Sequence, residues 1–274
     1  MRNFGMPTLI ENKTLEENLA LCRELGLGFV ELNMNFPEYQ LEQMEETAAF
    51  CRKADAAGVY YTIHLDENLN IADFNPLVRQ ACLETVRRSI ETAKAFVSLK
   101  NRHGDASQPM IVNMHMHHGI YITLPDRKVY MYERDFNAYM ACIHHFRACC
   151  RQWIGKADVK ICIENTDGFR PYEMAAIRAL LEEDCFMLTW DIGHSKAIGE
   201  KDMPFLLANR ERLGHFHIHD GMENPPKNHL ALGDGEINLA DRLQLARELN
   251  ARCVLETKTI AALKKSTAWL KNVR

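Results

Sequence analysis

ICIEN (161–165) is a short apolar run that carries an acidic residue, Glu164, where the apolar stretch stops. The pattern recurs in three later runs: FMLTWD (186–191), LGHFHIHD (213–220) and CVLE (253–256). These runs have the length of β-strands, and they bring a metal-binding type of side chain to or near the strand end: Glu164, Asp191, His217 and Glu256. Carboxylate oxygens and an imidazole nitrogen form a divalent-metal site, provided that the fold gathers the strand ends.

The whole chain alternates apolar runs of strand length with longer amphipathic segments. The expected strands are 3–9, 28–33, 59–65, 109–115, 159–164, 186–191, 214–219 and 252–256. The expected helices lie near 14–25, 40–57, 76–100, 133–153, 171–183, 203–211, 238–249 and 259–271. Strict alternation predicts a parallel sheet with helical crossovers.

Eight such units are the number that closes into a barrel, in which functional groups gather at the carboxyl ends of the strands. We therefore predict a single (β/α)8 TIM barrel domain over residues 1–274. A doubly wound open sheet is the alternative, and it is disfavoured because no GxGxxG or Walker-type phosphate loop follows the first strand.

Composition limits the function classes. A formal net charge of −4 and a pI of about 6.3 do not indicate a polyanion partner, so nucleic acid is not expected. No apolar run approaches the roughly 20 residues needed to span a bilayer, so no membrane association is expected. The first ten residues, MRNFGMPTLI, are too short and polar for a secretory signal, and we expect a cytoplasmic protein with free cysteines.

Further histidines follow the predicted strand ends, and they surround the first four candidates: His64, His115, His194 and His229. In HFHIH, the residues His215, His217 and His219 share one face because strand side chains repeat every two residues. A lone strand histidine is usually a core or surface residue, but recurrence on consecutive strands favours a metal or catalytic site.

Three cations also lie just past strand ends, namely Arg170, Lys196 and Lys258. Each can pair with an anionic substrate group or lie solvated in a loop, and composition does not decide between these. The segment 116–135 is long for a strand-to-helix loop, which is typical of lids and specificity elements.

The sequence resembles the xylose isomerase-like barrel superfamily of sugar isomerases and epimerases, which includes endonuclease IV. The resemblance spans nearly the whole chain and rests on these blocks: IHLDENLNI (63–71), VNMHMHHG (112–119), IENTDG (163–168), DIGH (191–194), GHFHIHD (214–220), LGDGEIN (232–238) and LET (255–257).

The resemblance to the ketose-epimerase-like members implies one divalent ion (Mn, Mg, Zn or Co) held by Glu164, Asp191, His217 and Glu256. It also implies proton exchange by Glu164 and Glu256, and a substrate contact by His194. The implied partner is a sugar or sugar phosphate, and relatives are often homo-oligomers. His64 and His115 either hold a second ion with Glu164 or bind sugar hydroxyls, and we favour the latter.

The endonuclease branch holds three zinc ions, and its further ligands match His64, His115, His194 and His229. Lys227 stands where that branch has an aspartate, and an ammonium group there would repel a third ion. The epimerase subgroup usually has an arginine where this chain has Glu223.

The sequence thus predicts a metal-dependent sugar isomerase or epimerase. The alternatives are an endonuclease IV-like zinc phosphodiesterase and a non-catalytic protein that retains the ion. For an isomerase or epimerase, the expected substrate-binding residues are Arg170, Lys258, His64, His115 and His194.

Overall fold

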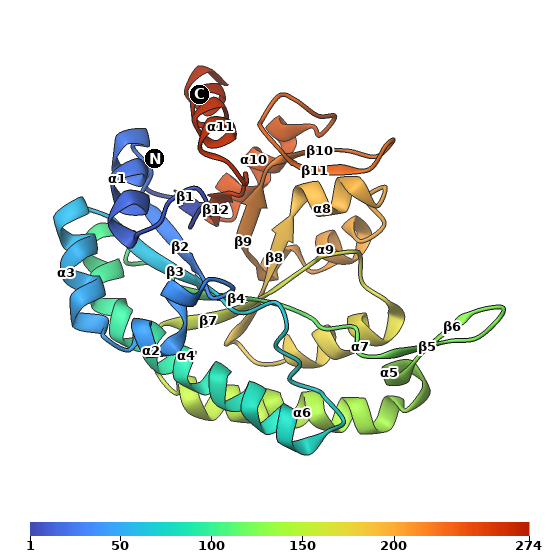
Figure 1. Ribbon diagram of the computed structural model, residues 1–274. Coiled ribbons are helices and arrows are strands. Elements are labelled where there is room, and N and C mark those ends of the chain that lie inside the picture. The colour runs from blue at the N-terminus through green and yellow to red at the C-terminus, as the bar shows by residue number, and fades with distance from the viewer. Residues whose placement is uncertain (274) are drawn as a thin grey trace.

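The computed structural model of the chain describes residues 1–273, and its centre is a closed barrel of eight parallel strands surrounded by helices (Figure 1). The barrel strands are β1 (Phe4–Pro7), β2 (Phe29–Asn33), β3 (Tyr60–His64), β4 (Met110–His115), β7 (Val159–Glu164), β8 (Phe186–Asp191), β9 (Leu213–Ile218) and β12 (Arg252–Leu255). Around the barrel they follow chain order, and β1 pairs with both β2 and β12. The predicted (β/α)8 fold is confirmed, and the open-sheet alternative is excluded.

Helices cover the outside of this barrel. They are α1 (Leu15–Leu25), α2 (Leu41–Met44), α3 (Thr47–Ala57), α4 (Pro76–His103), α5 (Met131–Arg134), α6 (Phe136–Ile154), α7 (Pro171–Leu180), α8 (Ile192–Ala197), α9 (Met203–Ala208), α10 (Leu239–Glu248) and α11 (Ile260–Val273). Two 3₁₀ turns, η1 (Pro37–Tyr39) and η2 (Arg210–Arg212), precede α2 and β9.

Local sequence signals fix several helix ends. Thr14 accepts a hydrogen bond from the backbone N–H of Glu17, whose carboxylate returns the interaction, so α1 begins with a capping box. Gly26 ends α1 with a φ of 72° and Gly58 ends α3 with a φ of 70°, a left-handed conformation that glycine adopts without steric cost.

Boundaries differ from the prediction where short breaks interrupt a helical pattern. The expected helix 40–57 is two helices, α2 and α3, and the expected helix 133–153 is α5 followed by α6. The helix α8 was not expected. It begins directly after β8 because the carboxylate of Asp191 accepts the backbone N–H of His194 at 2.6 Å.

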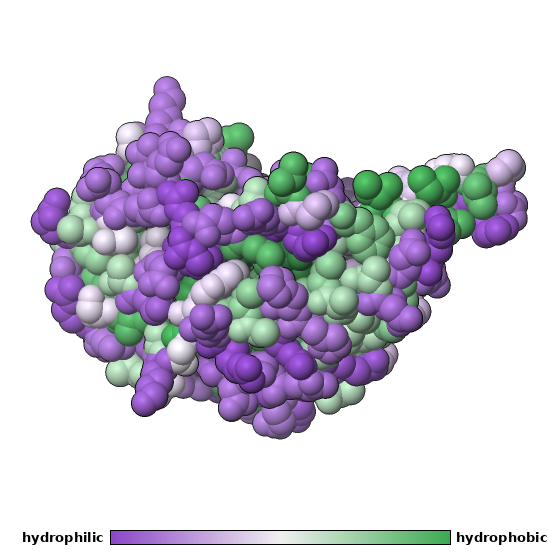
Figure 2. Space-filling model, turned by 90° about the horizontal axis from the view of Figure 1, so that it is seen from below, coloured by the Kyte–Doolittle hydropathy of each residue, from purple (hydrophilic) through white to green (hydrophobic). Residues whose placement is uncertain are grey.

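The long segment 116–135 contains an antiparallel hairpin, β5 (Tyr121–Thr123) and β6 (Lys128–Tyr130), that projects from the body as an arm (Figure 1). A second hairpin, β10 (Asp220–Met222) and β11 (Lys227–Leu230), follows β9. Figure 2 shows apolar side chains along the arm, where Ile120 and Ile122 are 66% and 50% exposed. The segment that was expected to be a loop is thus an ordered hairpin, and its two strands pair with each other rather than with the barrel.

Strand alternation separates the barrel interior from the helical layer. On β8 and β9, Trp190 and Phe216 face outward and pack 6.1 Å apart between ring centroids, whereas the neighbouring Asp191 and His217 face inward. Among residues 1–273, no helix has the length and apolar character needed to cross a bilayer.

Candidate metal centre and active site

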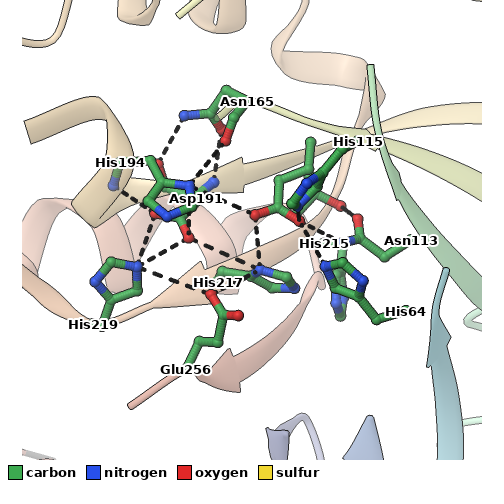
Figure 3. A network of polar contacts seen from close by, with 12 residues as sticks. His64, Asn113, His115, Asn165, Asp191, His194, His215, His217, His219 and Glu256 are labelled. Atoms are coloured by element: carbon green, nitrogen blue, oxygen red, sulfur yellow. Dashed lines mark hydrogen bonds and ion pairs between the residues drawn. The ribbon is translucent and has the colours of Figure 1, made fainter. Parts of the chain in front are cut away.

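Four side chains from the last four barrel strands and the loop after them converge inside the barrel: Glu164, Asp191, His217 and Glu256. One ligand atom from each lies within 4.8 Å of the others. His217 Nδ1 is central, at 3.1 Å from Glu164 Oε1, 3.2 Å from Glu256 Oε2 and 3.9 Å from Asp191 Oδ2. Figure 3 shows His217 between Asp191 and Glu256.

Strand register produces this convergence. Asp191 on β8 pairs with His217 on β9, and His217 pairs with Val254 on β12, two residues before Glu256. Glu164 ends β7, one strand further round the barrel. Neighbouring strands therefore deliver their side chains to one level near the carboxyl end.

The cluster is buried, and its electrostatics depend on mutual pairing. Burial disfavours ionisation of Glu164, but His217 and His115 outweigh that cost and hold the pKa of Glu164 well below its usual range. Glu256 has a similarly lowered pKa, because His217 and Lys258 outweigh its burial. Burial opposes a charge on His217 as well, yet the carboxylates around it raise its pKa well above its usual value. Glu164 and Glu256 are thus carboxylates at neutral pH.

The donor set fits a divalent ion. Three carboxylates supply hard oxygen ligands, and one imidazole supplies a nitrogen ligand. This combination suits Mn²⁺, Mg²⁺, Zn²⁺ or Co²⁺. Glu256 Oε2 is buried without a hydrogen bond among the described residues, while Lys258 Nζ binds the other oxygen, Oε1, at 2.9 Å. His217 Nδ1, 3.2 Å from Oε2, compensates part of the cost of burying this oxygen, and a bound cation would compensate more.

His64 and His115 form one flank of the cluster (Figure 3). Their Nε2 atoms lie 3.4 and 3.3 Å from Glu164 Oε2. Burial disfavours protonation of His64, but hydrogen bonding to Glu164 raises its pKa to about 9. The two histidines and Glu164 form a second possible ligand group that shares Glu164 with the first.

A third group, His194, His219 and His229, lies on the opposite flank. The Nδ1 atom of His229 contacts the carbonyl oxygen of Glu256 at 2.9 Å, and the Nε2 atoms of His229 and His194 face each other at 3.4 Å. Burial lowers the pKa of His229 to about 4, so this imidazole is neutral. His219 Nε2 binds a carboxylate oxygen of Asp191 at 2.9 Å.

The predicted substrate cations are paired with carboxylates of the chain itself. Arg170 binds Asp167 at 2.8 Å and Glu173 at 3.2 Å, and its guanidinium lies over the ring of Tyr130. Lys258 binds Glu256, as described, and Lys196 Nζ lies 3.7 Å from Glu236. Their expected contact with substrate stays a prediction.

The buried polar residues that contact the candidate ligands and keep them in position were not identified from the sequence. Asn113 donates to Glu164, and Asn165 donates to the carbonyl oxygen of Asp191 at 2.9 Å. Glu31 on β2 lies beneath His217. Its signal in the sequence is a single acid inside the strand FVELN (29–33), between apolar residues, rather than at the strand end.

A family profile described as "Xylose isomerase-like TIM barrel" matches residues 19–273. The chain belongs to this family. The membership confirms the resemblance that the sequence blocks indicated. No curated protein sequence matches the chain.

Solved structures of similar fold include sugar epimerases. A D-tagatose 3-epimerase-like protein is 20% identical with a TM-score of 0.74, covering 99% of this chain and 96% of the other. The 3-keto-D-glucoside 4-epimerase YcjR of E. coli is 18% identical with a TM-score of 0.74, covering 99% and 100%. A Methylomonas sp. D-allulose 3-epimerase in complex with D-allulose is 13% identical with a TM-score of 0.68, covering 99% and 96%. At these identities, the likeness shows the fold alone.

Proposed function

We propose that this chain, as a single barrel domain, is a divalent-metal-dependent sugar isomerase or epimerase that transfers a proton at the carbon beside a carbonyl. The observation that carries the proposal is the placement of two buried carboxylates, Glu164 and Glu256, within 3.2 Å of the same His217 nitrogen. Two carboxylates at one site can remove a carbon-bound proton and return it. The fold shared with sugar epimerases supports the same assignment.

Glu164, Asp191, His217 and Glu256 would hold the ion. When bound, the ion supplies electrostatic stabilisation of the negative charge that develops on the sugar oxygens. Glu164 and Glu256 are both available as the base, because their lowered pKa values keep them ionised at neutral pH. The carboxylate that takes the carbon-bound proton would become the acid that can return it. His194 is 16% exposed at the edge of the cluster, where it can contact and orient a sugar hydroxyl.

The rim favours an uncharged sugar over a sugar phosphate. Binding a phosphate group at Arg170 or Lys258 would compete with carboxylates that already neutralise these cations. His64 and His115 offer imidazole groups beside Glu164, and hydroxyl groups of a sugar are suitable partners for them.

Deuterium exchange tests the reaction. Incubation with candidate ketoses in deuterated water should exchange one carbon-bound proton, and Glu164→Gln and Glu256→Gln should each reduce exchange by about 10²–10⁴-fold because the base is lost. The matched control is Glu236→Gln, a rim carboxylate that pairs with Lys196 and should leave exchange unchanged. Exchange that survives both site substitutions would remove the assigned bases.

A second candidate is a zinc phosphodiesterase of the endonuclease IV kind. It is favoured by the two histidine-containing groups that flank the four-residue cluster, since together they could hold more than one ion. Lys227, two residues before His229, is exposed on β11 and would place a positive charge near a third ion. Metal analysis separates the candidates: about one ion per chain supports the epimerase, and two or three zinc ions with cleavage of an abasic-site duplex support the phosphodiesterase. A chain that binds metal but does neither would be the non-catalytic binding protein.

A further inference from the structure

Glu31 lies at the base of the candidate metal centre, inside the barrel. Its carboxylate is 2% exposed and divides its two oxygens between two histidines of β9. Glu31 Oε1 is 2.9 Å from His217 Nε2, and Glu31 Oε2 is 3.0 Å from His215 Nε2. The hydroxyl of Thr62 on β3 donates to Oε2 at 2.9 Å.

We propose that Glu31 is a positioning residue, which fixes the ring orientation and tautomer of His217 so that Nδ1 is free to bind a divalent ion. This inference rests on the proposed metal-dependent function.

The physical reason is the division of roles between the two ring nitrogens. His217 Nδ1 faces Glu164 and Glu256, whereas Nε2 faces Glu31. A carboxylate can only accept hydrogen bonds, so it holds a proton on Nε2 and leaves the lone pair of a neutral ring on Nδ1. A carboxylate behind a ligand histidine fixes ring orientation and raises the basicity of the ligand nitrogen.

Glu31 is itself held in place. β2 pairs with β3 so that Glu31 lies opposite Thr62, whose hydroxyl fixes one oxygen. His215, two residues before His217 on β9, fixes the same oxygen from the other side. His217 Nε2 lies 2.9 Å from Oε1, although the pair does not have the angle of a regular hydrogen bond.

Glu31→Gln tests the proposal sharply. A glutamine has one accepting oxygen and one donating amide group. Because Thr62 already donates toward the Oε2 position, the oxygen is favoured there and the amide group faces His217 Nε2. That arrangement forces the proton of His217 onto Nδ1, where it blocks the ion.

The experiment measures the dissociation constant of Zn²⁺ or Mn²⁺ by competition with a chelator, without any sugar. Glu31→Gln should weaken binding by about 10–100-fold. Histidine ¹⁵N NMR of the metal-free Glu31→Gln variant, at a pH where the ring is neutral, should show the His217 proton on Nδ1 instead of Nε2, a change that a merely structural role would not predict. Glu31→Asp, which retains a carboxylate, should recover part of the affinity.

Glu173→Gln is the matched control, because the side chain of Glu173 is also buried, at 3% exposure, but contacts Arg170 rather than the centre. It should leave the dissociation constant within about twofold. Equal losses in Glu31→Gln and Glu173→Gln, or wild-type affinity in a folded Glu31→Gln, would overturn the proposal. If Glu31→Gln does not fold, Thr62→Val decides, since removing the hydroxyl should weaken binding several-fold and unchanged binding contradicts the role. A wild-type chain that binds no divalent ion would instead refute the proposed function itself.

Discussion

The two ends of the barrel both bury charged side chains, but they arrange them in opposite ways. At the amino end, Arg252 on β12 binds the hydroxyl of Tyr60 at 3.0 Å and the carbonyl oxygen of Pro109, and the buried Lys100 pairs with Asp158. Arg252 and Lys100 thus each bind acceptors of the chain, although Arg252 Nη2 has no hydrogen bond among the described residues. At the carboxyl end, three carboxylates meet around one histidine nitrogen, and Glu256 Oε2 lacks a hydrogen bond within residues 1–273.

The difference distinguishes buried charges that hold the fold together from buried charges that form a binding site. A buried charge that the chain satisfies by itself contributes to one rigid arrangement, and its loss leaves unpaired groups behind. Carboxylates that converge repel one another and need cations among them, supplied either by histidines of the chain or by a bound ion, so such a cluster indicates a binding site. The contrast predicts that substitutions at the amino end lower the stability of the fold with or without metal. At the carboxyl end, stability should instead depend on bound metal and on pH.

The largest effect on stability should come from the amino end. Arg252→Met leaves the Tyr60 hydroxyl and the Pro109 carbonyl without their donor, at about 1–3 kcal/mol for each buried group. Urea unfolding should show this loss with and without metal. Arg247→Met, on an exposed position of α10, should change stability by no more than about 0.5 kcal/mol. Equal stability of the two variants would contradict the structural role of Arg252.

The next effect is a pH dependence of the metal-free protein. The pKa of His64 is raised from 6.5 to about 9, so the stabilisation by its charged form is complete below pH 6.5 and is lost as pH rises through about 9. The loss is on the order of 3 kcal/mol. Urea unfolding between pH 6 and 10 measures it, and His64→Gln should flatten the profile. The lowered pKa values of Glu164 and Glu256 act in the other direction, since their contribution is lost as pH falls below about 4.

The smallest of the three effects is stabilisation by the ion. Adding a divalent ion to chelator-treated protein at about 100 times its dissociation constant should stabilise the folded state by about 2.7 kcal/mol. Thermal unfolding measures this as a higher midpoint. Arg252→Met should gain as much from metal as the wild type, because its defect lies at the other end of the barrel. An unchanged midpoint in the wild type would argue against a metal centre.

The sequence determined the eight strands, the helix caps and the order in which the candidate ligands follow one another at the strand ends. These follow from local rules: alternation sets which side chains face inward, and Thr14, Gly26 and Gly58 set helix ends within a few residues. Glu164, Asp191, His217 and Glu256 were recognisable because a parallel barrel must bring its strand ends to one face.

Only the tertiary structure decided which polar residues touch. Glu31 and His217 lie 186 positions apart, and their contact depends on register around a closed barrel, in which a shift of one residue would turn either side chain to the outer face. The pairing of Lys196 with Glu236 and the contact of Arg170 with the ring of Tyr130 likewise join residues far apart in the sequence, whose partners local pattern does not specify. Periodicity predicts which way a side chain faces, whereas closure of the barrel determines what it meets.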